Sequence, residues 1–213
     1  MALFLDSALV SEARTATQFG WVQGITTNPT LLAQSPLPPG ETLKELAGLT
    51  SGPIFYQLTA SSVAEMVKEA RQANDLLGSQ LVCKIPPTKA GFTVTSELSG
   101  SIPCAVTAVF APAQAMVAEA AGARYVILYY HRAILNIASP LKMVFELVSV
   151  LAGSSVELIA ASLKSPEEVV AARIAGIRHH TLPLGILQQM VENELSQQAV
   201  DDFAVRGRGI FTP

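Results

Sequence analysis

Short apolar runs alternate with longer amphipathic segments along nearly the whole chain. Eight of these runs have the length and composition of buried strands: Ala2–Asp6, Gly24–Thr27, Pro53–Thr59, Leu81–Pro86, Cys104–Phe110, Tyr125–Tyr130, Val156–Ser162 and His179–Pro183. Strands that alternate with helices are typical of a parallel sheet covered by helices. Eight such units predict the α/β class and a closed (β/α)8 barrel, the TIM barrel, followed by a C-terminal helical tail.

The segments between the runs carry signals of helices. Two apolar stripes with helical spacing are expected to pack on the sheet: Val63, Met66, Val67 and Ala70 in one segment, and Leu141, Val144, Phe145 and Val148 in another. The pairs Ser62 with Glu65 and Ser165 with Glu168 have the spacing of capping boxes, and Pro166 occupies the first helical position of the second. These pairs therefore predict two helix starts.

The whole chain, residues 1–213, is predicted to be one barrel domain with a tail. The proline-rich segment Ser35–Gly40 is interpreted as a loop between short helices, because composition does not change across it. The barrel should extend to about Ser196. The tail, Gln197–Pro213, contains a short helical stretch and an apolar end. It either packs on a neighbouring subunit or is a frayed end.

Composition limits the class of protein. The chain has 213 residues, of which 50% are hydrophobic and 15% are charged, so it can build one packed core and is not a disordered protein. Its 14 lysines and arginines against 17 aspartates and glutamates give a net charge of −3, and no basic stripe is present. Nucleic acid is therefore not expected as a partner.

The two cysteines and the N-terminus indicate a compartment. Cys83 and Cys104 lie in apolar stretches without metal-ligand spacing, which predicts buried thiols in a reducing cytoplasm. The first residues lack a basic segment and reach Asp6 too early for a signal peptide. The longest uncharged stretch, Leu98 to Ala118, is interrupted by glycine and prolines, so we expect no membrane span there.

Polar residues close nearly every predicted strand. They are Asp6, Thr26 with Asn28, Gln57, Lys84, Thr107, Tyr129 with Arg132, and Ser162. In a (β/α)8 barrel the carboxyl ends of the strands meet at one mouth, where catalytic groups gather. The sequence therefore predicts one polar site built from many strands.

Lys84 is the most informative of these residues. It interrupts an apolar strand, with Val82 on the same face and Cys83 on the other. A lysine that is desolvated loses its proton more readily and becomes a nucleophilic amine, suited to forming a Schiff base with a carbonyl. The alternative is a surface lysine whose stem lies along the barrel.

Other candidates also have simpler interpretations. Asp6 would lie near the amine, or it caps the helix that follows the first strand. Thr26 and Asn28 would bind substrate, or they provide ordinary N-cap chemistry before Pro29. The three histidines lack a pattern of carboxylate partners, so no metal site is expected. Schiff-base chemistry at a lysine requires neither a metal nor an organic cofactor.

Six segments, taken together, resemble a known family. FLDSA, GITTNPTLLA, VCKIPPT, VTAVF, YYHR and AASLKSP, in this order and at these spacings, resemble the transaldolase-like class I aldolases. The resemblance covers nearly the whole chain. Gln57 stands where transaldolases usually have glutamate, and Tyr129 where they usually have phenylalanine, so the sequence is most similar to the fructose-6-phosphate aldolase branch.

The resemblance implies roles for the strand-end residues. Lys84 would be the Schiff-base lysine, and Asp6, Thr26 and Asn28 would bind hydroxyls and direct proton transfer. Gln57, Thr107 and Tyr129 would hold a water that shuttles protons, and Arg132 and Ser162 would bind phosphate, while Lys164 is better interpreted as a solvated surface lysine. The resemblance also implies a cytoplasmic homo-oligomer, a pentamer or decamer, in which C-terminal helices cross between subunits.

Three functions follow as hypotheses. The first is a class I aldolase (a lyase) that reversibly cleaves fructose 6-phosphate, or a close analogue, to dihydroxyacetone and glyceraldehyde 3-phosphate. The second is a transaldolase that transfers the three-carbon unit to erythrose 4-phosphate, and the third is a barrel that only binds sugar phosphates. After Arg132 the short apolar loop AILNIASP replaces the family's usual Gly/Asp-rich loop, which leaves the aldehyde substrate open.

Overall fold

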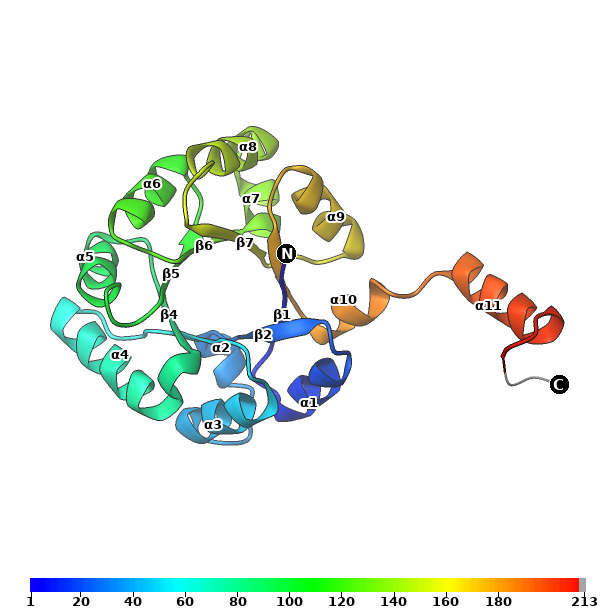
Figure 1. The fold of residues 1–213 in the computed structure, drawn as a ribbon. Helices are drawn as coiled ribbons and strands as arrows, with labels where there is room; N and C mark the ends of the chain where they lie inside the picture. Colours follow the sequence, from blue (N-terminus) through cyan, green and yellow to red (C-terminus); the bar gives the residue numbers. More distant parts are fainter. Residues whose placement is uncertain (211–213) are drawn as a thin grey trace.

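The computed structural model describes residues 1–210, and within this range eight parallel strands close into a barrel surrounded by helices (Figure 1). The strands are β1 (Leu3–Asp6), β2 (Val22–Thr26), β3 (Ile54–Gln57), β4 (Leu81–Ile85), β5 (Cys104–Val109), β6 (Tyr125–Tyr129), β7 (Glu157–Ala161) and β8 (His179–Leu182). Each strand pairs with the next, and β8 pairs with β1. The predicted (β/α)8 barrel is therefore confirmed.

A helix follows every strand. The helices are α1 (Val10–Gln18), α2 (Pro29–Leu32), α3 (Pro39–Leu49), α4 (Val63–Leu77), the 3₁₀ helix η1 (Gly78–Gln80), α5 (Lys89–Leu98), α6 (Pro112–Ala120), α7 (Tyr130–Asn136), α8 (Pro140–Val150), α9 (Pro166–Ile174), α10 (Leu184–Gln189) and α11 (Glu194–Arg206). The segment Ser35–Gly40 connects α2 to α3 and continues into the first turn of α3, so the predicted loop between short helices is confirmed in outline.

All eight predicted strands are present, and no predicted end differs from the observed one by more than two residues. The largest difference at a carboxyl end is in β3, which stops at Gln57 rather than Thr59. The backbone N–H groups of Thr59 and Ala60 donate to the Glu69 carboxylate of α4 instead of to a neighbouring strand. Because these N–H groups already have an acceptor on α4, β3 stops pairing with its neighbours before Thr59.

Alternation along the strands creates two apolar clusters. Nine residues fill the interior of the barrel: Ala2, Phe4, Phe55, Val82, Ala105, Tyr125, Ile127, Ile159 and Ala161. The ring of Phe55 packs against Phe4 at 5.3 Å and against Tyr125 at 5.2 Å between centroids. We call these nine residues the floor, because they close the barrel below its polar end.

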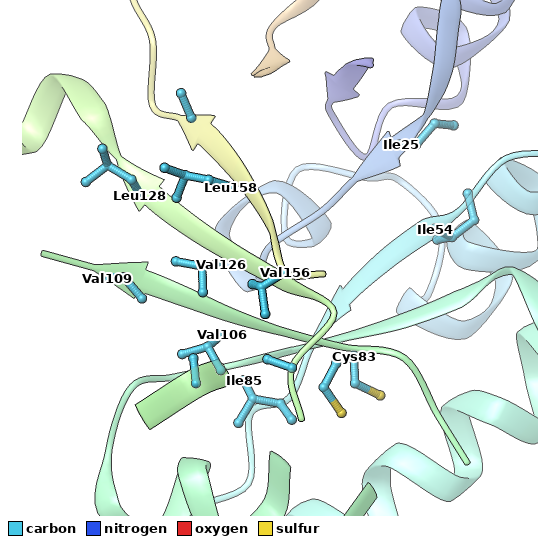
Figure 2. Packing of buried hydrophobic residues seen from close by; sticks show 14 of the residues in the cluster. Ile25, Ile54, Cys83, Ile85, Val106, Val109, Val126, Leu128, Val156 and Leu158 are labelled. Carbon is cyan, nitrogen blue, oxygen red and sulfur yellow. The ribbon is translucent and has the colours of Figure 1, made fainter. Parts of the chain in front are cut away.

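The larger cluster lies between the strands and the surrounding helices (Figure 2). It contains Cys83 and Cys104, which are both free and buried, as predicted. Burial raises the pKa of each thiol to about 12. Both thiols are therefore protonated near neutral pH and serve as packing groups.

The predicted helix starts are confirmed. Ser62 Oγ accepts from the Glu65 N–H, and Ser165 Oγ accepts from the Glu168 N–H, each at 3.3 Å. Pro166 is the first residue of α9. The stripe in α4 is also confirmed, since Met66, Val67 and Ala70 are buried and Val63 packs at the edge of the core.

The stripe predicted for α8 is half right: Val144 is buried and Val148 packs at the edge of the core, but the other two members do not. Leu141 and Phe145 are 53% and 55% exposed, whereas Met143, Val144 and Leu147 are buried. The segment LKMVFELVSV is apolar on two sides, so helical spacing allows two different stripes. The barrel buries the one centred on Val144 and Leu147.

The last helix stands apart from the barrel. An extended segment joins α10 to α11 (Figure 1), and every residue in the range 191–210 is exposed. The helix begins at Glu194, three residues before the predicted tail, because Asn193 caps it through the Ser196 N–H at 3.0 Å. The last residues of the predicted tail, 211–213, lie outside the described part of the chain.

None of the helices in residues 1–210 combines the length and the apolar character that crossing a bilayer requires.

Candidate active site

A polar layer lies directly above the floor. In several strands the inward residue of the floor is followed, two positions later, by a polar inward residue. These pairs are Phe4 and Asp6, Phe55 and Gln57, Val82 and Lys84, Ala105 and Thr107, and Ile127 and Tyr129. Since side chains two apart share one face of a strand, the polar set converges at the carboxyl end of the barrel.

A cavity of about 600 Å³ opens at this end. Its wall includes seven of the nine predicted site residues: Asp6, Asn28, Gln57, Lys84, Tyr129, Arg132 and Ser162. The other two, Thr26 and Thr107, are buried and do not line the cavity. The structure thus brings seven of the nine predicted residues together around one cavity.

A second cavity, of about 540 Å³, lies at the opposite end of the barrel. Its wall contains Met1, Glu157, Arg178 and His179, at the amino ends of β1, β7 and β8. His179 Nε2 lies 3.1 Å from Glu157 Oε2. That end of a (β/α)8 barrel usually serves stability, so the cavity of about 600 Å³ is the candidate active site.

Lys84 is buried at the centre of the polar layer. Its side chain is 4% exposed, and Nζ donates a hydrogen bond to the Thr27 carbonyl oxygen at 2.6 Å. Burial lowers the pKa of the amine, and the negative charge of Asp6 partly opposes this effect. The alternative of a surface lysine is therefore wrong, and the amine is prepared to lose its proton.

Asp6 belongs to a chain of hydrogen bonds. Its Oδ1 accepts from Thr26 Oγ1 at 2.7 Å, and Thr26 Oγ1 lies 2.5 Å from Thr181 Oγ1. Because Thr26 has one hydroxyl hydrogen and gives it to Asp6, Thr181 donates to Thr26. Helix α1 begins only at Val10, so the alternative of Asp6 as a helix cap is wrong.

Asn28 does act as a cap. Its Oδ1 accepts from the Leu31 N–H at 3.0 Å at the start of α2. The same side chain lines the cavity, which means that the cap orients the amide at the wall. The capping interpretation is confirmed, and it is compatible with a place in the site.

Gln57 and Thr107 carry buried polar atoms with free hydrogen-bonding capacity. Within residues 1–210, neither Gln57 Oε1 nor Thr107 Oγ1 has a hydrogen-bond partner. Beyond Thr107 the β5–β6 register shifts, and Ala108 has a φ of 60°. A non-glycine residue in the left-handed region is strained, and such strain is often found at functional sites.

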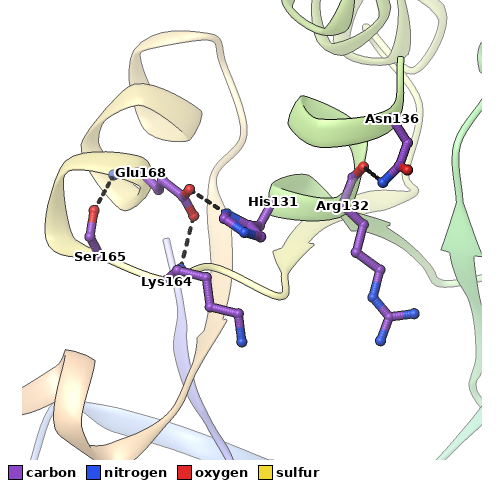
Figure 3. A network of polar contacts seen from close by, with 6 residues as sticks. All are labelled: His131, Arg132, Asn136, Lys164, Ser165 and Glu168. Atoms are coloured by element: carbon purple, nitrogen blue, oxygen red, sulfur yellow. Dashed lines mark hydrogen bonds and ion pairs between the residues drawn. The ribbon is translucent and has the colours of Figure 1, made fainter.

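A second group of cavity residues comes from the ends of β6 and β7. The Arg132 guanidinium lies over the Tyr129 ring at 4.9 Å from the centroid. Ser162, directly after β7, has a φ of 63°, the second strained non-glycine position in residues 1–210. Arg132 and Lys164, both drawn in Figure 3, line the cavity, so two cations face it here.

Sequence reasoning missed several contributors. Thr181 was missed because only the residue that closes each strand was considered, although its inward position on β8 follows from alternation. The Thr27 carbonyl is a backbone acceptor and leaves no signal in residue type. Glu12 also lines the cavity, from the first turn of α1.

No group of three or more His, Cys, Asp or Glu side chains in residues 1–210 is arranged to hold a metal ion.

The barrel and its polar cavity define a TIM-barrel protein whose candidate chemistry lies at the carboxyl ends of the strands. The sequence profile of the family described as "Transaldolase/Fructose-6-phosphate aldolase" matches residues 3–208, so the chain belongs to that family. The chain is therefore a transaldolase-family enzyme.

Curated relatives match over nearly their whole length. A "Probable transaldolase" of Coprothermobacter proteolyticus is 32% identical over 206 residues, covering 95% of this chain and 94% of that protein. A "Probable transaldolase" of Clostridium kluyveri is 34% identical over 206 residues, covering 95% of each.

Solved structures agree on the fold alone. An orotidine 5'-monophosphate decarboxylase from Metallosphaera sedula superposes with a TM-score of 0.61 at 15% identity, covering 97% of this chain and 98% of that one. A mandelate oxidase gives a TM-score of 0.64 at 15% identity, covering 96% of this chain and 75% of that one.

Proposed function

We propose that the chain is a class I aldolase that reversibly cleaves fructose 6-phosphate, or a close analogue, to dihydroxyacetone and glyceraldehyde 3-phosphate. The observation that carries this proposal is the Lys84 amine, buried above an apolar floor at a polar cavity, with its pKa lowered by burial. A neutral amine in such a place is the nucleophile that Schiff-base chemistry requires.

The first step joins Lys84 to the substrate. The lone pair of Nζ adds to the keto carbon of the open-chain sugar, and the oxygen is protonated to give a carbinolamine. Loss of water then leaves an iminium ion. Because Asp6 carries a negative charge near Nζ, it stabilises the positive nitrogen that forms, and it is placed to exchange protons with the departing oxygen.

The second step breaks the carbon–carbon bond. A base removes the proton of the hydroxyl on the carbon beta to the iminium carbon, and the electrons of the broken bond move into the iminium. Glyceraldehyde 3-phosphate leaves and an enamine remains on Lys84. Protonation of the enamine carbon and hydrolysis release dihydroxyacetone and restore the amine.

We assign the proton transfers to the polar layer. The free acceptor capacity of Gln57 and Thr107 supports a water held between them and the Tyr129 hydroxyl. Gln57 is an amide and cannot itself take a proton, so such a water would carry protons to and from Asp6 or the substrate. Thr26 and Asn28 are assigned to the donor hydroxyls.

We assign the phosphate to the Arg132 side of the cavity. Arg132 offers a forked set of donors, and Lys164 adds a second positive charge at the wall. The strained turn at Ser162 directs the loop after β7 toward the same space. The N-terminus of α9 adds little to this side, because the Glu168 carboxylate already accepts from the Lys164 N–H and brings a negative charge there.

Transaldolase activity is the second candidate, and the names of the curated relatives favour it. The chemistry of the two activities is shared up to the enamine. They differ in whether the enamine is protonated or waits for a second aldehyde. Gln57 and Tyr129, where the resemblance expects glutamate and phenylalanine in transaldolases, favour the aldolase.

Product analysis separates the two candidates. Incubation with fructose 6-phosphate alone is expected to release dihydroxyacetone, measured with a coupled reductase. Adding erythrose 4-phosphate should change this rate by less than about 3-fold, because protonation of the enamine competes well with the acceptor. Dihydroxyacetone release that is negligible, with sedoheptulose 7-phosphate formed only when the acceptor is present, would establish the transferase instead.

We further propose that α11 packs on a second copy of this chain. Leu195, Ala199 and Phe203 recur at intervals of one helical turn, and Leu195 and Phe203 are 74% and 72% exposed. A helix that leaves such a stripe uncovered needs a partner surface. Together with the resemblance, this supports one barrel domain per chain in a pentamer or decamer.

Deleting residues 191–213 tests this assembly. The full chain is expected to scatter light as an oligomer, and the truncated chain as a smaller species. Phe203→Ser should also weaken the assembly, whereas Gln197→Ser, on the opposite face of α11, serves as the matched control. A full chain that is monomeric at micromolar concentration would exclude the proposal.

A further inference from the structure

Glu168 holds two parts of the cavity wall at once (Figure 3). Its Oε1 lies 2.6 Å from His131 Nδ1, and its Oε2 accepts from the Lys164 N–H at 2.8 Å. His131 lies in the first turn of α7, and Lys164 lies in the loop after β7. One carboxylate therefore ties the two segments that carry the cations facing the cavity.

This use of Glu168 differs from that expected of a capping box. The Ser165 side chain accepts from the Glu168 N–H, as the spacing predicts, but the Glu168 side chain does not return to the Ser165 backbone. It turns instead to His131, 37 residues away in the chain. The Ser165 cap thus fixes the start of α9, from which the Glu168 carboxylate reaches His131 of α7.

The contact with His131 restrains the start of α7. Arg132 follows His131 directly, and its guanidinium lies over the Tyr129 ring. The Arg132 carbonyl accepts from Asn136 Nδ2 at 2.7 Å within the same helix. A fixed His131 and a stacked guanidinium together leave Arg132 few orientations, which lowers the entropy lost when it binds an anion.

The contact with Lys164 restrains the other half of the wall. Lys164 lies two residues after the strained Ser162, and its backbone N–H is held by Glu168. Both segments are thereby fixed with respect to α9 and to each other. The carboxylate and the imidazole are each only partly exposed, so bulk solvent competes less with their contact.

The negative charge of Glu168, taken by itself, is unfavourable for binding a phosphate beside Arg132 and Lys164. A carboxylate close to a phosphate subsite repels the phosphate, so a role in direct binding does not account for it. We propose that Glu168 and His131 are positioning residues that set the separation of Arg132 from the loop at Ser162 to Lys164 and thereby select a phosphorylated substrate. This inference rests on the proposed function, of which it specifies the phosphate side.

The sign of the effect distinguishes positioning from electrostatics. Glu168→Ala removes a negative charge, which by charge alone would tighten anion binding. Positioning predicts the opposite: inorganic phosphate, titrated by calorimetry, should bind about 10-fold or more weakly than to the unchanged protein. Glu167→Ala is the matched control, because Glu167 carries the same charge in the same turn but is exposed. Phosphate should bind to the Glu167→Ala variant at least as tightly as to the unchanged protein.

Substitutions of His131 supply a second test. His131→Asn places an amide nitrogen near the position of Nδ1 and should retain phosphate affinity within about 3-fold, whereas His131→Ala should resemble Glu168→Ala. His131→Ala leaves the contact between Glu168 and Lys164 in place, so it remains informative if Glu168→Ala does not fold. The double variant should lose little more phosphate affinity than either single variant, since both substitutions remove the contact between Glu168 and His131.

Kinetics with two sugars complete the test. Glu168→Ala should raise KM for fructose 6-phosphate about 10-fold, with kcat changed less than about 3-fold, and leave kcat/KM for fructose nearly unaltered. Equal losses for both sugars, or phosphate affinity equal to that of Glu167→Ala, would overturn the inference. Failure of the unchanged protein to cleave either sugar would refute the proposed function, while the phosphate titrations would still decide the role of Glu168.

Discussion

Lys84→Met is expected to abolish cleavage of fructose 6-phosphate while the protein stays folded. Methionine has no amine nitrogen and cannot form an imine, so turnover should fall by at least about 10⁴-fold. Treating the unchanged protein with substrate and borohydride should reduce the iminium and leave a stable adduct on Lys84, found by peptide mass analysis. The variant should carry none.

The control for this experiment is Lys89→Met, at the exposed start of α5 five residues further along the chain. It should keep both turnover and the adduct on Lys84. An adduct on another lysine, or undiminished turnover in Lys84→Met, would show that the buried amine is not the nucleophile. A sugar that binds without any adduct would favour a barrel that only binds sugar phosphates.

Lys84→Met is also expected to raise the melting temperature by a few degrees. The pKa of Lys84 is lower in the folded chain than in the unfolded chain. Folding at neutral pH therefore releases a proton or buries a charge, and this cost diminishes as the pH rises toward the ordinary pKa of lysine. Methionine of similar volume removes the cost and keeps the packing.

Asp6→Asn should lower kcat by roughly 10²- to 10³-fold, because a group that exchanges protons with the substrate is replaced by one that does not. The asparagine oxygen can still accept from Thr26, so the hydrogen-bonded chain through Thr181 should persist. The loss is then expected in the chemistry rather than in the fold, and the melting temperature checks this point.

The pH profile gives Asp6→Asn a second readout. The charge of Asp6 raises the pKa of Lys84 against the effect of burial, so its removal should lower that pKa further. The acidic limb of kcat/KM should move to lower pH. Glu12→Gln removes a carboxylate elsewhere on the cavity wall and should move the limb far less. A limb that stays in place or moves to higher pH in Asp6→Asn would contradict the assignment.

Most of the fold was predictable because strand period and burial act locally. The eight apolar runs, the inward side of Lys84 opposite Cys83, and the caps at Ser62 and Ser165 all follow from spacing of a few residues. The prediction failed where spacing was ambiguous. Helix α8 is apolar on two sides, and only the shape of the barrel decides that Val144 is buried and Phe145 is not.

The site was predictable where residue type and strand position both mattered. Seven of the nine predicted residues line one cavity, because each closes a strand of the same barrel or follows one closely. The partner of Lys84 Nζ was not predictable, since any residue has a carbonyl. The contact between His131 and Glu168 was equally hidden, because it depends on how α7 and α9 pack.

The floor of aromatic and aliphatic side chains separates the two ends of the barrel. Apart from the Tyr125 hydroxyl, the nine side chains of the floor are apolar, so they offer no chain of polar groups from the amino ends of the strands to Lys84. Substitutions at the amino ends of the strands are thus separated from the cavity by the floor, and substitutions in the loops at the carboxyl ends are separated from the amino ends in the same way. The burial that lowers the pKa of Lys84 comes partly from this floor, so a change in a loop at the mouth can alter what the cavity admits while that pKa stays lowered.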